Sequence, residues 1–447
     1  MQFKVNKRLL YPVFSAVILA VGTYIAIQYA TGALRISRNG IMQGSGLLSA
    51  TSDPQGAELL LDGRLVSATN DTIYLEPKSY EVKIAKEGFT DWQKTLEVLP
   101  EVVTQANARL FPAAASLTPL TFSGVSNLLP SPDGQKLLYY VASQSAVQKN
   151  GLYVMELTSN TFSLQRGPRQ ILQADSRYNI QAADIIWSPD STELLVMTKQ
   201  KEVLLTLDQT HTLDQLPDVS FRRRQILSQW EEEMYLRERQ YLSTFPPAII
   251  AMATESAKNT YFSPNKKSLL YTATASATLA PDLIPPVPGA SNQTQVRELK
   301  PGYIYVYDRE EDRNFELGPE PVSTQSGTKA LLATDLLNRD PVTYVASPSA
   351  FTRLQASESA KTAQNFRRYH SPLFANTFQW FPDSQHLLFV ADNSVRVIEI
   401  DGTNNISLYA GPFDNNFLYP WPDGNRALIT TSFSPTAAPN LYAIELR

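Results

Sequence analysis

The phrase Ser131-Pro132-Asp133-Gly134, followed by Leu137-Leu138, decides the fold because variants of it recur along the chain. Proline fixes φ at the second position of a tight turn, and Asp, Asn, Ser and Gly suit the positions that follow. An apolar run comes after each copy, so each phrase predicts a strand, a turn and a second strand. The other copies are Ser188-Pro189-Asp190-Ser191, Ser263-Pro264-Asn265-Lys266, Phe381-Pro382-Asp383-Ser384 and Trp421-Pro422-Asp423-Gly424.

A third β-forming run follows most copies of the phrase, and two units also have a run with the character of an outer strand. One small sheet cannot bury both of its faces, so its recurrence predicts a stacked or radial repeat. The longest interval between copies has room for one degenerate unit, and we therefore predict a ring of five or six blades. The third strands are predicted at 152–157, 203–208, 303–308, 395–400 and 441–446, and outer strands at 170–172 and 407–409.

The composition excludes several kinds of partner and reaction. Of the 447 residues, 43% are hydrophobic and 18% are charged, which allows two or three domains with a sizeable core. The net charge of -4 gives no basic footprint for nucleic acid, so we expect no nucleic-acid partner. The sequence contains no Cys, which excludes disulfides and thiolate chemistry, and it contains only three His.

The N-terminus predicts a membrane anchor. Residues 9–34 carry no charge, and about 20 apolar residues suffice to cross a bilayer. Three cations precede the run and favour a cytoplasmic N-terminus. We therefore expect a single-pass protein of the cell membrane, in which residues 1–35 form a cytoplasmic tip and a transmembrane helix and the bulk is extracytoplasmic. A signal peptide cleaved near residues 30–33 is the alternative, although its apolar core is usually shorter.

A small β domain is predicted at residues 46–112, after a short linker at 36–45. Asp62-Gly63 between two apolar runs is a strong hairpin signal. Four phrases of this stretch, in order, resemble the PEGA domain, a small β-sandwich found in envelope and surface-layer proteins. They are Pro54-Gln55-Gly56-Ala57, Asp62-Gly63, Tyr80-Glu81-Val82, and Lys86-Glu87-Gly88-Phe89 with Trp92. The resemblance implies a spacer or binding module without catalytic residues.

The repeated phrase resembles the blades of the periplasmic Tol-system propeller, which carry Trp-Ser-Pro-Asp-Gly before an apolar strand. Trp187-Ser188-Pro189-Asp190 is one of the nearest matches. The resemblance implies a Tol-type, WD-like β-propeller over residues 113–447. The last blade stops after its third strand, so we expect residues 117–122 to complete it as an outer strand.

Three insertions interrupt the repeats. Residues 220–245 predict an amphipathic helix whose apolar stripe includes Trp230 and Met234. We expect this stripe to be buried against the propeller, with a partner helix or a membrane surface as the alternatives. Residues 272–301, rich in Ala, Thr, Ser and Pro, predict a flexible excursion within one blade. A second flexible insertion is predicted at 324–368.

Candidates for chemistry are few. One acidic residue recurs in each phrase, but Asn265 takes that place in one copy, so a turn role is the preferred interpretation. The three His are scattered and predict neither a metal site nor a catalytic cluster. The run Asp308-Arg309-Glu310-Glu311-Asp312 lacks the glycine of a calcium loop and predicts a solvated hairpin end. We therefore assign no catalytic, metal or cofactor-binding residue and expect no cofactor. The candidates weighed are Asp133, Asp190, Asp383, Asp423, His211, His370 and His386.

The predicted fold class is all-β, with an N-terminal transmembrane helix, a small PEGA-like β-sandwich and a β-propeller of five or six blades with helical insertions. Two functions stay open. The first is a membrane-anchored extracytoplasmic interaction or cell-envelope scaffold protein whose propeller binds a protein or a glycan. The second is a propeller-fold glycan hydrolase or lyase that uses carboxylates. The sequence has no nucleophile motif and no His cluster, which favours the first.

Overall fold

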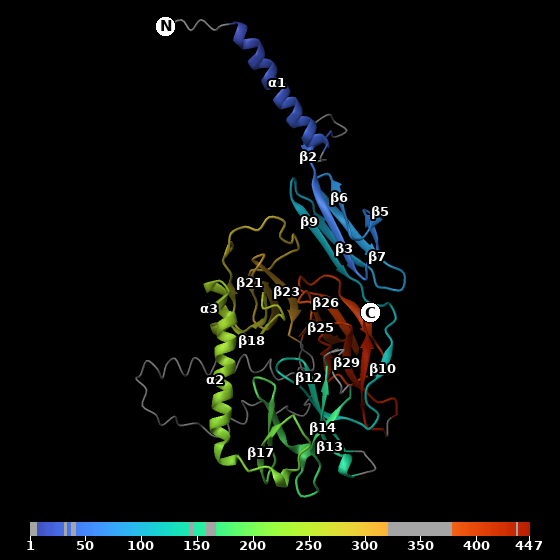
Figure 1. The fold of residues 1–447 in the computed structure, drawn as a ribbon, viewed down its shortest axis with the longest axis vertical. Helices are drawn as coiled ribbons and strands as arrows, with labels where there is room; N and C mark the ends of the chain where they lie inside the picture. Colours follow the sequence, from blue (N-terminus) through green and yellow to red (C-terminus); the bar gives the residue numbers. More distant parts are fainter. Residues whose placement is uncertain are drawn as a thin grey trace, which may run out of the picture. The chain divides into compact units, whose positions relative to one another are not determined.

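The computed structural model describes residues 7–30, 34–36, 42–142, 147–157, 167–320, 378–434 and 437–447. This part is rich in β-strands and has three α-helices (Figure 1). The chain divides into two compact units, of which unit 1 comprises Met1–Phe111 with Val287–Gln293 and unit 2 comprises Pro112–Pro286 with Thr294–Arg447. The predicted insertion at 324–368 and the candidate His370 lie outside the described residues.

Helix α1 spans Lys7–Ala30. Across the residues that the structure describes, no helix combines the length and the apolar character needed to cross a membrane. The predicted N-terminal transmembrane helix is therefore wrong. Residues 9–34 lack charge, but a span also needs about 20 predominantly apolar residues, and the described helix does not meet that requirement.

Unit 1 contains two sheets that enclose a common core. One has the strand order β6-β3-β9 and the other β5-β4-β7-β8. Inward residues alternate with outward ones along the strands, and Leu48, Val82 and Trp92 are buried in one cluster between the sheets. The strands are β3 (Gly46–Asp53), β4 (Glu58–Leu61), β5 (Arg64–Ala68), β6 (Asp71–Leu75), β7 (Ser79–Ala85), β8 (Trp92–Glu97) and β9 (Val103–Arg109), preceded by the paired β1 (Leu34–Ile36) and β2 (Met42–Gly44).

The turn between β4 and β5 is the predicted Asp62-Gly63 hairpin. Asp62 and Gly63 have φ values of 49° and 76°, and positive φ at both central residues gives the turn that matches the twist of paired strands. The Asp62 carboxylate also accepts the backbone N–H of Glu81 at 3.0 Å, which ties the turn to β7. The hairpin prediction is confirmed.

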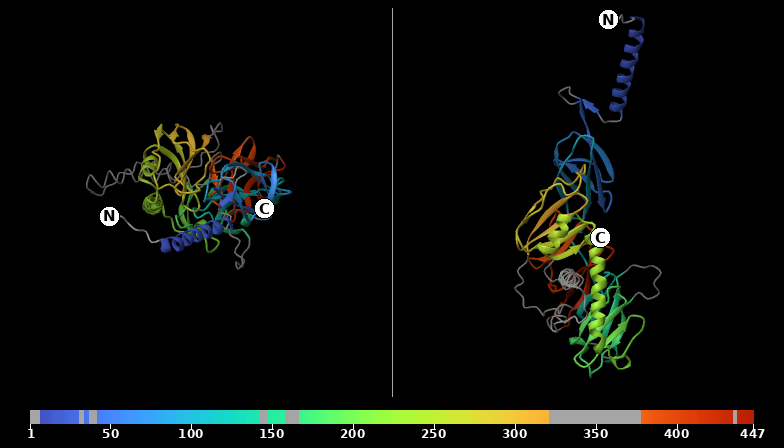
Figure 2. Two further views of the ribbon diagram at one scale, coloured as in Figure 1. Left: turned by 90° about the horizontal axis from the view of Figure 1, so that it is seen from above. Right: turned by 90° about the vertical axis from the view of Figure 1, so that its left-hand side faces the viewer.

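The described residues of unit 2 form five antiparallel sheets of three or four strands, which we call blades 1 to 5 (Figures 1 and 2). In each blade, one copy of the phrase forms the turn between the first two strands. Blade 1 consists of β11 (Ser126–Pro130), β12 (Lys136–Val141), β13 (Gly151–Glu156) and β14 (Arg169–Gln173), and blade 2 of β15 (Asp184–Trp187), β16 (Glu193–Met197) and β17 (Glu202–Thr206).

The other three blades each have four strands. Blade 3 consists of β18 (Ala257–Phe262), β19 (Ser268–Ala273), β22 (Tyr303–Asp308) and β23 (Arg313–Pro319), and blade 4 of β24 (Gln379–Trp380), β25 (His386–Ala391), β26 (Ser394–Glu399) and β27 (Ile406–Tyr409). Blade 5 consists of β28 (Leu418–Pro420), β29 (Arg426–Thr431), β30 (Asn440–Glu445) and β10 (Leu117–Pro119). Short 3-10 helices lie at Val147–Lys149, Ile180–Ala182, Leu213–Gln215 and Ser220–Arg222.

Buried apolar clusters join the blades into a ring. One cluster contains residues of blades 5 and 1, such as Leu428 and Leu137, and another joins blades 1 and 2. A third joins blades 3 and 4, and strands β24 and β25 contact β28 of blade 5. Blades 2 and 3 are connected through helices. This β-rich ring is compatible with the predicted propeller-like fold, and five of its blades fall within the described residues.

The ring is closed by a strand from its other end. β10 pairs antiparallel with β30, so that Leu117 lies opposite Ile444 and Pro119 opposite Tyr442. The backbone N–H of Leu120 adds a hydrogen bond of 2.8 Å to the carbonyl of Leu441. Proline is accepted because β10 is an edge strand. The prediction that the segment after residue 116 completes the last blade is confirmed.

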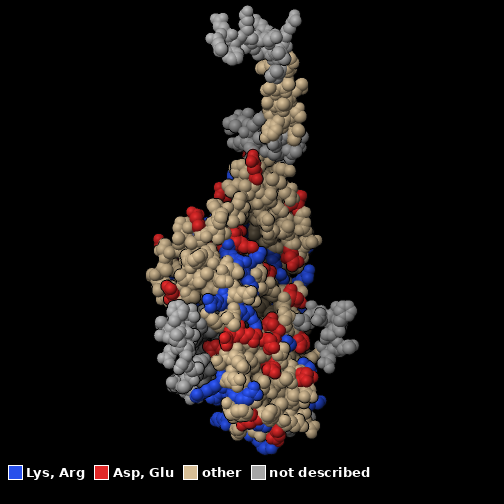
Figure 3. All heavy atoms as spheres, turned by 60° about the vertical axis from the view of Figure 1, so that its left-hand side comes forward, with Lys and Arg blue, Asp and Glu red and all other residues tan. Residues whose placement is uncertain are grey.

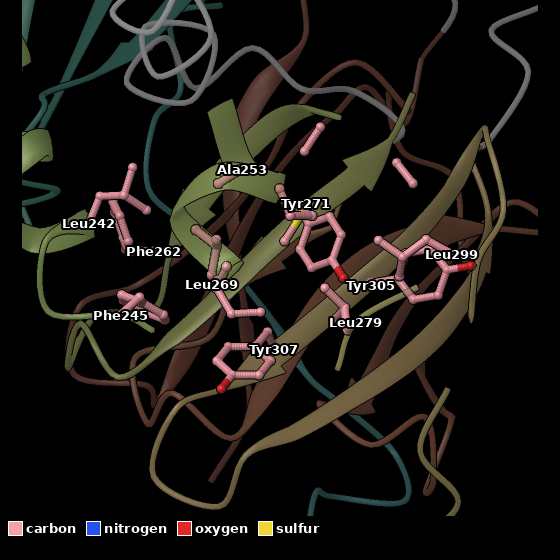
Figure 4. Packing of buried hydrophobic residues seen from close by; sticks show 14 residues of the cluster. Leu242, Phe245, Ala253, Phe262, Leu269, Tyr271, Leu279, Leu299, Tyr305 and Tyr307 are labelled. Atoms are coloured by element: carbon pink, nitrogen blue, oxygen red, sulfur yellow. The ribbon is translucent and has the colours of Figure 1, made fainter. Parts of the chain in front are cut away.

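Helices α2 (Arg223–Leu242) and α3 (Pro247–Glu255) follow blade 2 and precede blade 3. The start of α2 packs on blade 2 through Ile226 and Leu227. Its end packs with α3 on blade 3 in the cluster of Figure 4, where Leu242 is buried. The long helix thus runs from one blade to the other (Figures 1 and 2).

The predicted helix is present, and it packs on the propeller with the predicted face. Its buried positions, Ile226, Leu227, Glu238 and Leu242, lie on the same side as Trp230 and Met234, because residues three and four apart share a helix face. Trp230 packs against the cluster of α2 and blade 2, but Trp230 and Met234 are half-buried, so the expected burial of the stripe is only partial. The burial of the acidic Glu238 on this face was not predicted.

The predicted excursion at 272–301 lies between the second and third strands of blade 3. Two short strands, β20 (Ala277–Thr278) and β21 (Glu298–Leu299), pair with each other there. Leu279 and Leu299 are buried beside Tyr271 and Tyr305 (Figure 4). Both ends of the excursion are therefore anchored on the blade, and its flexibility stays a prediction.

Loss of β10 should destabilise the ring. A chain that begins at Gly124 loses the hydrogen bonds that join Leu120 to Leu441 and Glu445 to Ser116, each worth about 1 kcal/mol. We expect its free energy of unfolding to be lower by about 2 kcal/mol or more than that of a chain that begins at Ser116, measured by thermal and urea denaturation. A chain that begins at Ala113 is the control and should match the Ser116 start. Equal stability of the Gly124 and Ser116 starts would contradict the role of β10.

Candidate functional site

The five phrase turns share one hydrogen bond. In each copy, the side chain of the third residue accepts the backbone N–H of the residue two positions later. Asn265 makes the bond as the aspartates do, so it requires an oxygen atom but no charge. The turn role predicted for Asp133, Asp190, Asp383 and Asp423 is confirmed. The N–O distances are 2.9 Å for Gln135, 3.2 Å for Thr192, 3.0 Å for Lys267, 2.9 Å for Gln385 and 2.8 Å for Asn425.

The first residue of the phrase adds a second brace in three copies. The hydroxyls of Ser131, Ser188 and Ser263 each accept, at 2.9 Å, the backbone N–H five residues later. Each also donates to the acidic or amide side chain of its own turn. The turn is therefore fixed by a small network in which one serine serves as donor and acceptor.

In blade 4 the first phrase residue is not a serine, and a histidine five residues after the phrase start contacts the acidic side chain instead. Phe381 stands at the serine position, and His386 is buried with its Nδ1 atom 2.8 Å from the Asp383 carboxylate. His211, also buried, lies elsewhere, with its Nε2 atom 3.4 Å from the Thr206 hydroxyl. The two described histidines thus belong to separate local structures and form no common site.

The phrase turns also hold neighbouring blades together. The indole N–H of Trp187 in blade 2 donates to the Leu129 carbonyl of blade 1, and that of Trp380 in blade 4 donates to the Tyr261 carbonyl of blade 3, both at 3.1 Å. A serine hydroxyl adds a second contact at each junction. We call the contact between two neighbouring blades a seam, and seams 1–2 and 3–4 share this pair of bonds.

The serine contact comes from the fourth phrase residue. The Ser191 hydroxyl accepts the Asp133 N–H, and the Ser384 hydroxyl accepts the Asn265 N–H, again at 3.1 Å. Both serines have positive φ, 61° and 64°, a conformation that is uncommon for residues other than glycine. The bond to the neighbouring blade compensates for that backbone cost.

Seam 5–1 uses a tyrosine instead. The Tyr419 hydroxyl of blade 5 lies 3.3 Å from the Gly134 carbonyl of blade 1. A Cβ atom added at Gly134 would lie 2.8 Å from that hydroxyl. The glycine in this copy of the phrase therefore leaves room for the tyrosine of the neighbouring blade and suits its own φ of 72°.

Seam 2–3 differs from the others. Phe262 and Lys266 of blade 3 occupy the positions of the tryptophan and the fourth-residue serine. Helix α2 supplies the contacts in their place, because the Arg237 guanidinium donates to the Pro189 carbonyl of blade 2 at 3.0 Å. The Lys266 ammonium lies 5.0 Å from the centre of the Tyr241 ring.

A buried acid accompanies this lysine. Glu238 of α2 is only 3% exposed. Burial lowers the pKa of the Lys266 amine, and the negative charge of Glu238 partly opposes that effect. Burial also raises the pKa of Tyr261 to about 12, with a further contribution from Glu238. These groups therefore form one electrostatically coupled cluster at the blade 3 end of α2.

Sequence reasoning missed this cluster. Glu238 stands in a helix rich in charge, where an acid is expected to be solvated. Lys266 carried a signal, because the other copies of the phrase have only Ser or Gly at its position. An alignment of the five copies with one another therefore points to seam 2–3 before any coordinates are known.

Two aspartates of the acidic run at residues 308–312 form hydrogen bonds or ion pairs with nearby residues. Asp308 accepts the backbone N–H groups of Glu310 and Glu311 at 2.7 and 3.2 Å. Asp312 is buried, bonds the Tyr307 hydroxyl at 2.9 Å and pairs with Arg297 at 3.0 Å. The end of this hairpin is therefore partly buried, and the prediction of a solvated hairpin end is wrong. In the part of the chain that the structure describes, no group of three or more His, Cys, Asp or Glu could hold a metal ion.

Residues 45–113 match the model of the PEGA domain family. The resemblance inferred from the four phrases is thereby confirmed for this segment, which is a small part of the chain. No curated protein matches the chain.

Several solved structures are similar over much of the chain. A protein described as TolB from Agrobacterium tumefaciens is 12% identical over 71% of this chain and 76% of its own, with a TM-score of 0.21. Oligogalacturonate lyase from Vibrio parahaemolyticus is 9% identical over 82% and 86%, with a TM-score of 0.24. TolB from Acinetobacter baumannii is 11% identical over 87% and 63%, with a TM-score of 0.17. At such low values these similarities carry no argument about fold or function, which rest on the chain's own residues.

The two seam tryptophans should contribute more to stability than the tryptophan of α2. We expect Trp187→Phe and Trp380→Phe each to lower the free energy of unfolding by at least about 1 kcal/mol, because each leaves a carbonyl of the neighbouring blade without its indole donor. Trp230→Phe, on the half-buried face of α2, is the matched control and should cost less. Urea denaturation measures all three, and equal losses would contradict the seam role.

The turn of blade 2 should make stability depend on acid pH. The Ser188 hydroxyl is the main group that holds the pKa of Asp190 below its usual range. Because the folded pKa is lower than the unfolded value of about 3.9, the stabilisation is present above that value and is lost as pH falls through the folded pKa. Asp190→Asn, which copies Asn265, should therefore flatten the loss of stability below about pH 4. Parallel acid denaturation curves of the two proteins would contradict it.

Proposed function

We propose that this chain is an extracytoplasmic interaction or scaffold protein of the cell envelope, in which the PEGA domain serves as a spacer or binding module and the ring of blades binds a protein or a glycan. The observation that carries the proposal is the match of residues 45–113 to a PEGA domain, in the same chain as a ring of repeated sheets. Neither part depends on a membrane-spanning helix.

The phrase turns support a binding role for the ring. Hydrogen bonds link the phrase turns of blades 5, 1 and 2 into one set of loops, and those of blades 3 and 4 into a second set. Asp133, Asp190, Asn265 and Asp423 are exposed there. Loops held by a rigid scaffold are the usual place for recognition, and exposed carboxylates favour a partner that offers hydroxyl, amide or cationic groups.

The alternative, a glycan hydrolase or lyase, requires two carboxyl groups that act together, separated by roughly 5–9.5 Å in hydrolases. The buried acids among the described residues of the ring come from different elements: Glu238 from α2, Asp312 from blade 3 and Glu399 from blade 4. Asp312 is paired with Arg297, and Glu399 accepts the Asn404 amide at 2.7 Å. Their bonds serve the fold, and the binding role is therefore preferred.

Site-specific photo-crosslinking tests the binding role. A photoreactive residue at Gln385, exposed in the phrase turn of blade 4, should capture an envelope protein or a glycan in cells that express the full chain. Gln200 is the matched control, because it is an equally exposed glutamine in the turn between β16 and β17, at the opposite end of a blade from its phrase turn. Capture at Gln385 but not at Gln200 is expected.

Two results would count against the proposal. Equal capture at both positions, or at neither, would remove the phrase turns as the binding surface. Cleavage of a defined glycan by the purified chain, abolished in an acidic-residue variant, would establish the enzyme instead. Resistance of the expressed chain to protease added to both intact cells and spheroplasts would overturn the extracytoplasmic location.

A further inference from the structure

The seams of the ring are not equivalent. Seams 1–2, 3–4 and 5–1 each contain a buried cluster shared by the two blades and at least one hydrogen bond between their turns. None of the clusters formed by described residues contains side chains of both blade 2 and blade 3. The same holds for blades 4 and 5, but there strands β24 and β25 of blade 4 contact β28 of blade 5 directly. The α2–α3 segment occupies the junction of blades 2 and 3.

The helices hold the two blades unequally. Five buried residues form the cluster between α2 and blade 2, whereas fourteen form the cluster of α2, α3 and blade 3 shown in Figure 4. Apolar burial stabilises by about 25 cal/mol per Å², so the larger cluster binds the helices more tightly. The helices therefore belong with blade 3, and the contact with blade 2 is the weaker one.

Polar contacts dominate that weaker side. Arg223 of α2 pairs with Glu202 of blade 2 at 2.8 Å, and Arg237 donates to the Pro189 carbonyl. Basic and acidic side chains alternate down the face of unit 2 in Figure 3. The sequence of α2 itself is rich in both kinds, with Arg223 and Arg224, Glu231 to Glu233, Arg237 and Arg239. The Glu202 carboxylate is only 13% exposed, and its Oε2 atom is buried without a hydrogen-bond partner, so water would satisfy this atom if the contact separated.

Blade 3 also presents an unsatisfied polar group at this seam. Thr260 stands three residues before the phrase, where blades 1, 2 and 4 carry Leu128, Ile185 and Phe378 in clusters shared with the preceding blade. By the same register, Thr260 faces blade 2. Its hydroxyl is buried without a hydrogen-bond partner, which costs about 1–3 kcal/mol, and water would satisfy it if the seam opened.

From these contacts we infer that the ring opens at the seam between blades 2 and 3. Helices α2 and α3 move with blade 3 and separate from blade 2, and the Arg237–Pro189 and Arg223–Glu202 contacts hold the closed state. The opening is a conformational device of the ring itself and does not rest on the proposed binding function.

Distances between spin labels test the inference in the full chain, which has no Cys and therefore accepts introduced cysteines without background. Labels go at the fifth residue counted from each phrase start, an equivalent position in every blade. Thr192 and Lys267 report on seam 2–3, Gln135 and Thr192 on seam 1–2, and Lys267 and Gln385 on seam 3–4. We expect a broader distance distribution, with a longer component, across seam 2–3 only.

A pair of arginine variants on α2 identifies the closing contact. Arg237→Gln removes the bond to Pro189 and should shift the seam 2–3 distribution toward the longer component. Arg239→Gln changes an exposed arginine of the same helix and should leave it unchanged. Glu202→Gln, which weakens the other contact, should act like Arg237→Gln and serves if that variant folds poorly, as judged by circular dichroism.

Equal widths at the three seams, or a broad distribution at another seam, would overturn the inference. Identical seam 2–3 distributions in the Arg237→Gln, Glu202→Gln and Arg239→Gln proteins would overturn the closing role of α2.

Discussion

The hydrogen bond between the third phrase side chain and the backbone two residues later is the constraint on which unit 2 depends. It fixes the turn between the first and second strands, as for Asp133 with Gln135. A fixed turn fixes the strand register, and register decides which side chains face each neighbouring blade. A small local bond therefore controls the long-range packing of the ring.

The fourth phrase residue affects both the turn of its own blade and the contact with a neighbouring blade. Its positive φ is needed for the turn, and glycine is the easiest solution. Ser191 and Ser384 accept the backbone cost because their hydroxyls bond the preceding blade. Lys266 has the same backbone, with φ of 62°, but faces α2 instead. The residue at the fourth phrase position, Ser or Lys, therefore distinguishes a seam of direct blade contacts from one that is filled by a helix.

Seam 2–3 also differs from the other seams in that it buries an acidic side chain. Most acids of the phrase turns are exposed, whereas Glu238 is buried beside Lys266 and Tyr261. A buried acidic side chain loses hydration that its neighbours have to replace. An arrangement of this kind is seldom the most stable filling for a seam, which agrees with the opening that we infer there. Unit 1, by contrast, has an apolar core with conventional hairpin turns.

The sequence by itself determined the local elements. Proline and Asx residues specify turns through short-range sterics and hydrogen bonds, so the phrase strands, the Asp62-Gly63 hairpin and the PEGA domain were readable before any coordinates. The closing strand was also predictable, because an outer strand was missing from blade 5 and residues 117–122 had β character. Each of these follows from interactions within a few residues or from a simple count of strands.

Only the tertiary structure decided the rest. Helical periodicity placed Trp230 and Met234 on the inward face of α2, but their half-buried state and the burial of Glu238 on that face depend on the surfaces of blades 2 and 3. The N-terminal run was uncharged, but absence of charge is a weaker criterion than sustained apolar character, and the transmembrane prediction failed for that reason. The candidate cluster of Glu238, Tyr261 and Lys266 joins residues from two elements whose proximity is fixed by packing. Long-range packing depends on complementary surfaces, and a single sequence does not record which surfaces meet.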